Sequence, residues 1–398
     1  MSSAPAPRTP ALRCVVAGAG VLGITTAWRL AQAGADVVLV DGGASLGLAA
    51  SRATFAHVNA SYAGYWDYME LRRAGVEGYH RLRREPDGAP WWHDTGFVAV
   101  HRPGADVEAL DRHLVRLREA GYPVEPLDSA PDTVEPALRV DDAVRTLVFP
   151  SEGWVEMPSM LLDLQSRARQ LGVRVRAADP VVGIEPAGDD VAVRLRSDET
   201  LVCDRLVVCC GRWTDDVLAS AGIEGSLVAD DTALGTPVPG LLVATGEVDG
   251  SVGRVVAVDD VNLRPMGDGR TMVWSGVADH QLQERGGAQA PPAVIDRLAT
   301  ELVRTAARHV PALDRTGAEE AIVTQRALPT DGLPVVGPVD GADGVHVALA
   351  HAAVTLAPAL AESLVEEVVH ERPDPRLARF RPDRFTDAGQ TPDEDGPA

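Results

Sequence analysis

Residues 14–41 read CVVAGAGVLGITTAWRLAQAGADVVLVD, and this stretch decides the fold class. An apolar run leads directly into three glycines, Gly18, Gly20 and Gly23. A helical pattern follows, and a second apolar run ends at Asp41. Strand, glycine turn, helix and strand in this order predict a βαβ unit that binds a dinucleotide.

Each polar or glycine position in this unit has a physical role. Gly18 allows the tight turn, Gly20 lets the backbone approach a pyrophosphate, and Gly23 permits close packing of helix on strand. The phosphates are expected at the N-terminus of the helix, where free amides and the helix dipole favour negative charge. The carboxylate of Asp41, 23 residues after Gly18, accepts ribose hydroxyls and repels a 2′-phosphate. This excludes NADP and leaves NAD or FAD.

The charge balance excludes several classes of function. The chain has 398 residues with 37 basic and 58 acidic side chains, a formal net charge of −21, so no nucleic-acid partner is expected. All the basic residues are arginines, because the sequence contains no lysine. A pyridoxal-phosphate Schiff base, an aldolase-type lysine and a P-loop lysine are therefore excluded.

Cysteine usage and hydropathy predict a cytoplasmic protein that does not enter a membrane. Cys14, Cys203, Cys209 and Cys210 lie in or beside apolar runs, and their spacing matches neither a disulfide framework nor a metal site. We therefore expect free thiols in a reducing compartment and no bound metal. No apolar run approaches the roughly 18 residues of a membrane span. The oligomeric state is open, and a homo-oligomer is one alternative.

Between two segments of tail-like composition, 1–10 and 373–398, strand and helix patterns alternate as in an α/β protein. A helix is predicted over 158–171, with Pro158 in its first turn and a glycine just after its end. Residues 201–211 read as one buried strand that ends at a glycine.

Four further stretches resemble the D-amino-acid oxidase-like family of FAD-dependent amine and amino-acid oxidoreductases, which includes glycine oxidase and sarcosine oxidase. LGLAASRATFAHVNAS (46–61) is similar to the family's flavin-contacting loop. SEGWVEMPSMLLDLQSRARQLGVRV (151–175) and LVCDRLVVCCGRWTDDV (201–217) resemble its Pro-led helix and its strand that ends in glycine. RALPTDGLPVVGPVDGADGVHVALAHAAVTLAPAL (326–360) resembles its C-terminal segment. The four stretches occur in the family's order.

The resemblance implies a two-domain flavoprotein, with a Rossmann-type FAD-binding domain of the α/β class and a second, discontinuous α+β substrate domain. The FAD-binding domain is expected to comprise residues 11–82, 148–222 and 326–372. The substrate domain is expected to comprise residues 83–147 and 223–325.

The family also implies FAD as the cofactor and a set of contacts to it. The backbone of Val182 is expected to meet the adenine, and a helix starting near Pro358 is expected to direct its N-terminus at the flavin. The expected FAD-binding residues are Gly18, Gly20, Val21, Leu22, Gly23, Asp41, Gly42, Ala49, Ala50, Ser51, Thr54, Phe55, Ala56, Val182, Gly211, His351, Ala352, Ala353, Val354, Thr355 and Leu356.

The implied reaction oxidises the C–N bond of a small amine or amino-acid substrate by hydride transfer, and gives an imine that water hydrolyses. Arg326 matches the family arginine that pairs with a substrate carboxylate, and it is the first candidate catalytic residue. His57, just after the expected flavin contacts at Thr54, Phe55 and Ala56, is the second; it either faces the flavin or substrate, or packs as a partly buried histidine. Arg264 either makes a second anion contact or braces a strand turn.

Three alternatives stay open at this point. Some members of the family use a lysine to promote the reaction with O2, and this chain has none, so O2 and another electron acceptor are both possible oxidants of the flavin. An NAD-dependent dehydrogenase would share the N-terminal unit. A flavin-binding subunit without turnover would share all the motifs.

Overall fold

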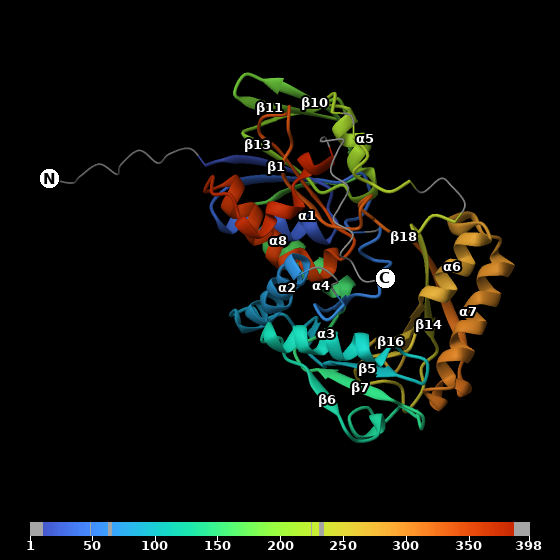
Figure 1. Ribbon diagram of the computed structural model, residues 1–398. Helices are drawn as coiled ribbons and strands as arrows, with labels where there is room; N and C mark the ends of the chain where they lie inside the picture. Colours follow the sequence, from blue (N-terminus) through green and yellow to red (C-terminus); the bar gives the residue numbers. More distant parts are fainter. Residues whose placement is uncertain (1–10, 48, 63–65, 224, 231–234, 386–398) are drawn as a thin grey trace.

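The computed structural model describes residues 11–47, 49–62, 66–223, 225–230 and 235–385, and it confirms the predicted two-domain α/β fold. Figure 1 shows the nucleotide-binding domain around β1 and β13 and the second domain around β5, β7, β14 and β16. No helix among the described residues is both long and apolar enough to span a bilayer.

The nucleotide-binding domain is built on a six-stranded sheet. The sheet order is β19-β20-β13-β1-β2-β9, with every neighbouring pair parallel except β19 and β20. The strands are β1 (Arg13–Ala17), β2 (Asp36–Val40), β9 (Arg174–Arg176), β13 (Arg205–Val208), β19 (Val335–Pro338) and β20 (Val345–Leu349). The predicted helix after the glycine turn is α1 (Val21–Gln32).

The side chains of β1 point alternately to the two faces of this sheet. Cys14 and Val16 point into a core shared with α1, α4 (Met157–Gln170) and α8 (Ala353–Val368). Val15 and Ala17 point into a second core, shared with a three-stranded sheet on the other face. The strands of that sheet are β10 (Val181–Ala187), β11 (Asp190–Leu195) and β12 (Thr200–Cys203). A parallel strand buried on both faces reads as a continuous apolar run, as residues 14–17 do.

The second domain is built on an eight-stranded sheet of order β18-β14-β17-β16-β15-β5-β7-β6. The parallel pair β5 and β15 joins strands from two distant parts of the chain, and the other neighbours are antiparallel. The strands are β5 (Phe97–His101), β6 (Glu125–Leu127), β7 (Arg145–Phe149), β14 (Pro239–Thr245), β15 (Val255–Val258), β16 (Val261–Pro265), β17 (Thr271–Ser275) and β18 (Ala318–Gln325).

One face of this sheet packs against helices and the other faces the nucleotide-binding domain. Leu241 and Val273 belong to a core with α6 (Gly276–Glu284) and α7 (Pro292–Ala307). Their neighbours Leu242 and Trp274 point to the opposite face, where they meet Phe55 of the predicted flavin loop. The two-residue alternation of a strand thus divides this sheet between a hydrophobic core and a candidate site.

A third sheet and several helices complete the described part of the fold. A small sheet is formed by β3 (His57–Val58), β8 (Gly153–Val155) and β4 (Trp92–His93). The remaining elements are α2 (Trp66–Arg84), α3 (Val107–Glu119), α5 (Thr214–Ala219), η1 (Pro131–Thr133), η2 (Gly211–Trp213), η3 (Gly287–Gln289), η4 (Pro311–Arg315), η5 (Pro375–Phe380) and η6 (Pro382–Phe385).

Part of the predicted C-terminal tail differs from the expectation. Residues 375–385 form η5 and η6, in which Leu377 and Phe380 are fully buried against the nucleotide-binding domain. The carboxylate of Asp374 accepts a hydrogen bond from the amide of Arg376 and caps η5. These two apolar side chains are three residues apart, so they lie on the same face of a 3₁₀ helix. The many charged residues around them hid this signal of a buried helix in the sequence. Residues 1–10 and 386–398 lie outside the described part of the chain.

The single strand predicted over 201–211 is two strands in different sheets. The chain turns at Asp204, between β12 and β13. Its carboxylate accepts hydrogen bonds from the backbone amide (2.6 Å) and the guanidinium (2.7 and 3.2 Å) of Arg13. An ion pair made across the sheet, not local sequence, therefore sets this boundary.

The last helix begins earlier than predicted. α8 starts at Ala353, so Pro358 lies inside it and not at its start. Proline has no N–H to donate to the carbonyl four residues before it, which is that of Val354. The hydroxyl of Tyr79, in α2, donates to that carbonyl oxygen at 2.6 Å and replaces the missing bond. A side chain distant in sequence thus makes the internal proline tolerable.

Candidate active site

The glycine turn is packed against two other segments. Gly18 has φ +94°, a conformation that favours glycine, and a Cβ there would collide with the carbonyl of Cys209. A Cβ on Gly23 would collide with the carbonyl oxygen of Gly18. At Gly20, a Cβ would come within 3.1 Å of the hydroxyl oxygen of Ser51. The backbone is bare where a ligand must approach and where helix meets strand, as the motif predicts.

Asp41 ties the end of β2 to the same turn. One carboxylate oxygen accepts from the amide of Ala19 at 2.6 Å, and the other accepts from the amide of Gly43 at 2.7 Å. A carboxylate has about four lone-pair sites, so two acceptor positions remain for ribose hydroxyls. The side chain therefore organises the turn as well as offering the predicted contact.

The glycine turn opens into a cavity of about 1160 Å³ between the two domains. Among the predicted site residues, three do not line it: Gly23, Leu356 and Val182. Gly23 and Leu356 lie in the interiors of α1 and α8. Val182 is 40% exposed, and Pro180 and Val181 line the pocket in its place. The predicted residues that do line it are Gly18, Gly20, Val21, Leu22, Asp41, Gly42, Ala49, Ala50, Ser51, Thr54, Phe55, Ala56, His57, Gly211, Arg326, His351, Ala352, Ala353, Val354 and Thr355.

The loop after Ser51 is held from both domains. The Ser51 hydroxyl accepts from the amide of Val21 at 2.9 Å, at the first position of α1. From the second domain, Arg264 donates through Nε to the carbonyl oxygen of Phe55. Arg264 also lies 4.9 Å from the ring centroid of Trp154, and burial lowers its pKa to about 10. Arg264 thus braces the loop after Ser51, which is neither of the two roles predicted for it from the sequence.

His57 lines the pocket with a buried carboxylate behind it. Its Nε2 lies 3.3 Å from Glu152, a contact that lacks hydrogen-bond geometry. Glu152 is fully buried and accepts from the amides of Ala60 (3.0 Å) and Ser61 (2.9 Å), the hydroxyl of Ser61 (3.1 Å) and the hydroxyl of Tyr122 (2.8 Å). Glu152 lies within residues 151–175, which resemble the family's Pro-led helix, but it is not among the predicted site residues.

Arg326 lies at the pocket wall with its guanidinium already bound. Nη2 forms an ion pair with Asp279 of α6, and Nη1 donates to the carbonyls of Pro237 (2.8 Å) and Pro239 (3.3 Å). Asp279 is 4% exposed and also accepts from the amide of Leu241 at 2.6 Å and, at 2.7 Å, from the Trp274 indole. A substrate carboxylate at Arg326 would therefore share the guanidinium with Asp279.

The loop before α8 contributes His351, whose ring faces the open volume of the pocket. Desolvation by the pocket walls and the positive charges of Arg326 and Arg72 together lower the pKa of its imidazole to about 4. The ring is therefore neutral at neutral pH. Next to it, the Thr355 hydroxyl donates to the carbonyl of His57 at 3.2 Å, which connects α8 to the predicted flavin loop.

Several residues that line the pocket are not among the predicted site residues. They come from several segments that are distant from one another in the sequence. They are Asn59, Tyr62, Arg72, Arg196, Arg212, Trp213, Asp216, Leu242, Asp259, Asp260, Asn262, Trp274, Thr324 and Gln325. A period-two pattern in β14, β16 and β17 was the only sequence signal available for part of this set.

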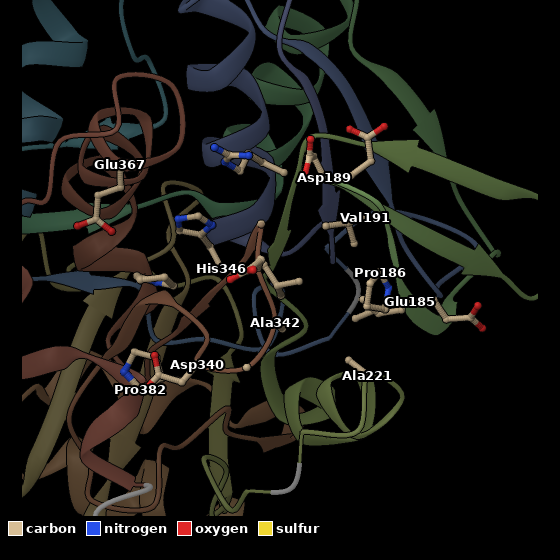
Figure 2. Close-up of a pocket in the computed structure, with 18 of the residues that line it drawn as sticks. Glu185, Pro186, Asp189, Val191, Ala221, Asp340, Ala342, His346, Glu367 and Pro382 are labelled. Atoms are coloured by element: carbon tan, nitrogen blue, oxygen red, sulfur yellow. The ribbon is translucent and has the colours of Figure 1, made fainter.

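A second cavity, of about 850 Å³, lies by the starts of β13 and β20 in the six-stranded sheet. Figure 2 shows the residues that line it. The hairpin β10–β11, the turn between β19 and β20, and the segment after α8 line it, and its labelled side chains include Glu185, Asp189, Asp340 and Glu367. Among the described residues, no group of three His, Cys, Asp or Glu is arranged to hold a metal ion. This cavity contains none of the predicted site residues.

His346 of β20 lies at this second cavity and predicts an acid-sensitive stability. It is 8% exposed, its Nδ1 has no hydrogen-bond partner among the described residues, and burial lowers its pKa from 6.5 to about 4. Between about pH 6.5 and pH 4, His346 therefore binds a proton in the unfolded chain but not in the folded chain. Each pH unit down to about 4 should cost up to about 1.4 kcal/mol of unfolding free energy.

Urea denaturation at pH 7 and pH 4.5 tests this expectation. His346→Gln should lose roughly 2 kcal/mol less unfolding free energy over this interval than the unsubstituted protein. His280→Gln, at a histidine whose side chain is 69% exposed, is the matched control and should leave the pH dependence unchanged. Equal losses for the unsubstituted protein and His346→Gln would contradict the assignment.

Comparisons with known proteins come from sequence and from structure. A profile of the family described as FAD dependent oxidoreductase matches residues 13–367. A 4-methylaminobutanoate oxidase (formaldehyde-forming) of Paenarthrobacter nicotinovorans is 25% identical over 63% of this chain and 30% of its own length. The mitochondrial dimethylglycine dehydrogenase of Rattus norvegicus is 23% identical over 93% of this chain and 44% of its own. The chain thus spans less than half the length of these relatives.

Two solved structures share the fold. The glycine oxidase of Geobacillus kaustophilus has a TM-score of 0.75 and 20% identity, covering 93% of this chain and 98% of its own. An L-amino acid deaminase of Proteus vulgaris, with a specific insertion deleted, has a TM-score of 0.80 and 16% identity, covering 97% of both chains. At these identities the similarity concerns the fold.

Proposed function

The chain belongs to the family of FAD-dependent oxidoreductases, and from this premise we propose that it oxidises the C–N bond of a small amino acid or amine. The observation that carries the proposal is the single cavity in which the glycine turn, the loop after Ser51 and the start of α8 meet the open face of the second sheet. The family match over residues 13–367 also favours FAD over the NAD alternative.

The residues present fit this cofactor. The bare backbone at Gly18 and Gly20 and the first turn of α1 would hold the pyrophosphate, and Asp41 would hold the adenosine ribose. The loop after Ser51 and the start of α8 would hold the ring. When bound, FAD supplies an acceptor for the hydride that leaves the carbon attached to nitrogen.

The chain's own groups create the environment for this transfer. Phe55, Leu242 and Trp274 form an apolar part of the pocket wall. The N-terminus of α8 opens on the pocket, and its dipole favours negative charge there by about 0.3 to 2 kcal/mol. The substrate contributes its nitrogen lone pair to the new C=N bond, and water hydrolyses the imine to a carbonyl compound.

Anaerobic titration of the purified holoprotein with amines and with D- and L-amino acids tests the function. At least one compound should bleach the visible flavin absorption and release a carbonyl product, whereas free FAD mixed with the same compounds should stay yellow. If dithionite bleaches the protein and none of these compounds does, the non-catalytic flavin-binding alternative holds. A colourless protein that binds NAD would overturn the proposal entirely.

The acceptor and the compartment are also proposals. We propose a cytoplasmic location, supported by four cysteines that form no disulfide. O2 or a separate electron acceptor completes the cycle. Mixing the substrate-reduced protein with air distinguishes these two acceptors. Reoxidation of the flavin as fast as turnover identifies an oxidase, and slower reoxidation identifies a dehydrogenase.

A further inference from the structure

Besides Arg326, which is paired with Asp279, the pocket wall contains Arg72 of α2. The charge of Arg72 is not compensated. Its Nε donates to the backbone oxygen of Asn59 at 2.9 Å, and Nη2 donates to the side-chain oxygen of the same residue. The guanidinium carbon also lies 5.4 Å from the ring centroid of Tyr68. All these partners are neutral. Within the described part of the chain, no carboxylate oxygen lies within 4.0 Å of this guanidinium.

The fold brings Arg72 to the pocket through close helix packing. Gly75, three residues later on the same face of α2, packs so tightly on the start of α8 that a Cβ would collide with the carbonyl of Thr355. Thr355 and His351 line the pocket, and the charge of Arg72 acts on His351. Arg72 therefore presents its charge beside the segment predicted to contact the flavin.

The other cations at the pocket wall are already engaged or lie elsewhere. Arg326 would leave Asp279, a buried carboxylate, without a cation if it turned toward a ligand, and such uncompensated charges are strongly destabilising. Arg212 donates to Gln325 and lies over the ring of Trp213. The backbone of Arg196 bonds to Pro180, at the predicted adenine end of the pocket.

We propose that Arg72, and not Arg326, binds the carboxylate of the substrate. This inference rests on the proposed function and narrows its substrate class to amines that carry a carboxylate. Two of the guanidinium nitrogens are held by Asn59, so the side chain is already oriented and Nη1 is left for an anion. Arg326 has a different role: it neutralises Asp279 and so fixes the position of α6 against β14.

Binding of simple carboxylates to the holoprotein tests the proposal without turnover. Acetate and benzoate, and their neutral analogues acetamide and benzamide, are titrated while the visible absorption of the bound flavin is recorded. Arg72→Gln should raise the Kd of the carboxylates about 10- to 100-fold and change the Kd of the amides less than about threefold. Arg73→Gln removes the same charge from the next residue, which pairs with Glu77, and is the matched control.

Two further variants keep the test decisive if Arg72→Gln folds poorly. Asn59→Asp leaves the guanidinium anchored but neutralises it, and should weaken carboxylate binding without affecting the amides. The double variant Arg326→Gln with Asp279→Asn removes the other ion pair as a unit and should leave the carboxylate Kd within about threefold.

The proposal is overturned if the double variant loses carboxylate binding while Arg72→Gln keeps it, or if the unsubstituted holoprotein does not prefer carboxylates to amides. If carboxylates bind through Arg72 but no amine bleaches the flavin, this inference holds and the proposed reaction fails.

Discussion

Replacement of Gly23 by alanine is expected to yield protein without bound FAD, with an unfolding free energy lowered by about 3 kcal/mol or more. The added Cβ would overlap the carbonyl oxygen of Gly18, which belongs to the same rigid turn, so neither side can yield cheaply. Opening the turn would also displace the amides of α1 that are proposed to hold the pyrophosphate. The measurements are the ratio of visible to ultraviolet absorption after purification and a urea denaturation curve.

Gly317→Ala is the matched control for this substitution. A Cβ on Gly317 meets no atom within 4 Å, and its φ lies outside the left-handed range. This variant should retain FAD and remain within about 0.5 kcal/mol of the unsubstituted protein. A yellow Gly23→Ala protein of unchanged stability would show that the turn is not as tightly packed as the structure indicates.

The second large effect is expected at Glu152. Glu152→Ala should lower the unfolding free energy by about 3 to 5 kcal/mol, because the amides of Ala60 and Ser61 and the hydroxyl of Tyr122 would lose their acceptor inside the core. Residues 60 and 61 are the last two of the predicted flavin-contacting loop, so the affinity for FAD should fall as well. Chemical denaturation and fluorescence titration of the apoprotein with FAD measure the two effects.

Two substitutions separate acceptor capacity from size and charge. Glu152→Gln keeps one acceptor oxygen and nearly the same volume, and should have an intermediate effect. Glu185→Ala, at an exposed carboxylate on β10, should change stability by less than about 0.5 kcal/mol. If Glu152→Ala is as stable as Glu185→Ala, then Glu152 does not organise the region behind His57.

Local chemistry made the nucleotide-binding unit predictable. The strand, turn and helix over residues 14–33 need a bare backbone at fixed offsets, and only glycine provides it. The same holds for Asp41, which lies at the end of the next strand. Most of the other predicted contacts also line the cavity. The family resemblance implied them, because they lie in continuous segments whose order matches the family pattern.

Prediction was weaker where two distant segments decide the outcome. The sequence predicts a helix that starts near Pro358, but α8 begins at Ala353 and the hydroxyl of Tyr79 satisfies the carbonyl that the proline leaves free. The buried strand predicted over 201–211 divides at Asp204 because Arg13 binds that carboxylate across the sheet. In both cases the deciding partner comes from another part of the chain.

The sequence by itself determined the dinucleotide unit, the exclusion of lysine chemistry and the resemblance that indicates FAD, since each depends on residue types at short and fixed spacing. Only the tertiary structure decided how the charges are compensated. Arg326 follows a family pattern in the sequence, yet Asp279 comes from a helix more than forty residues earlier and neutralises it. Arg72 has no motif, yet packing of α2 on α8 brings it to the pocket with neutral partners. Whether a charge is compensated depends on the distance in space to an opposite charge, and the spacing of residues in the sequence does not specify that distance.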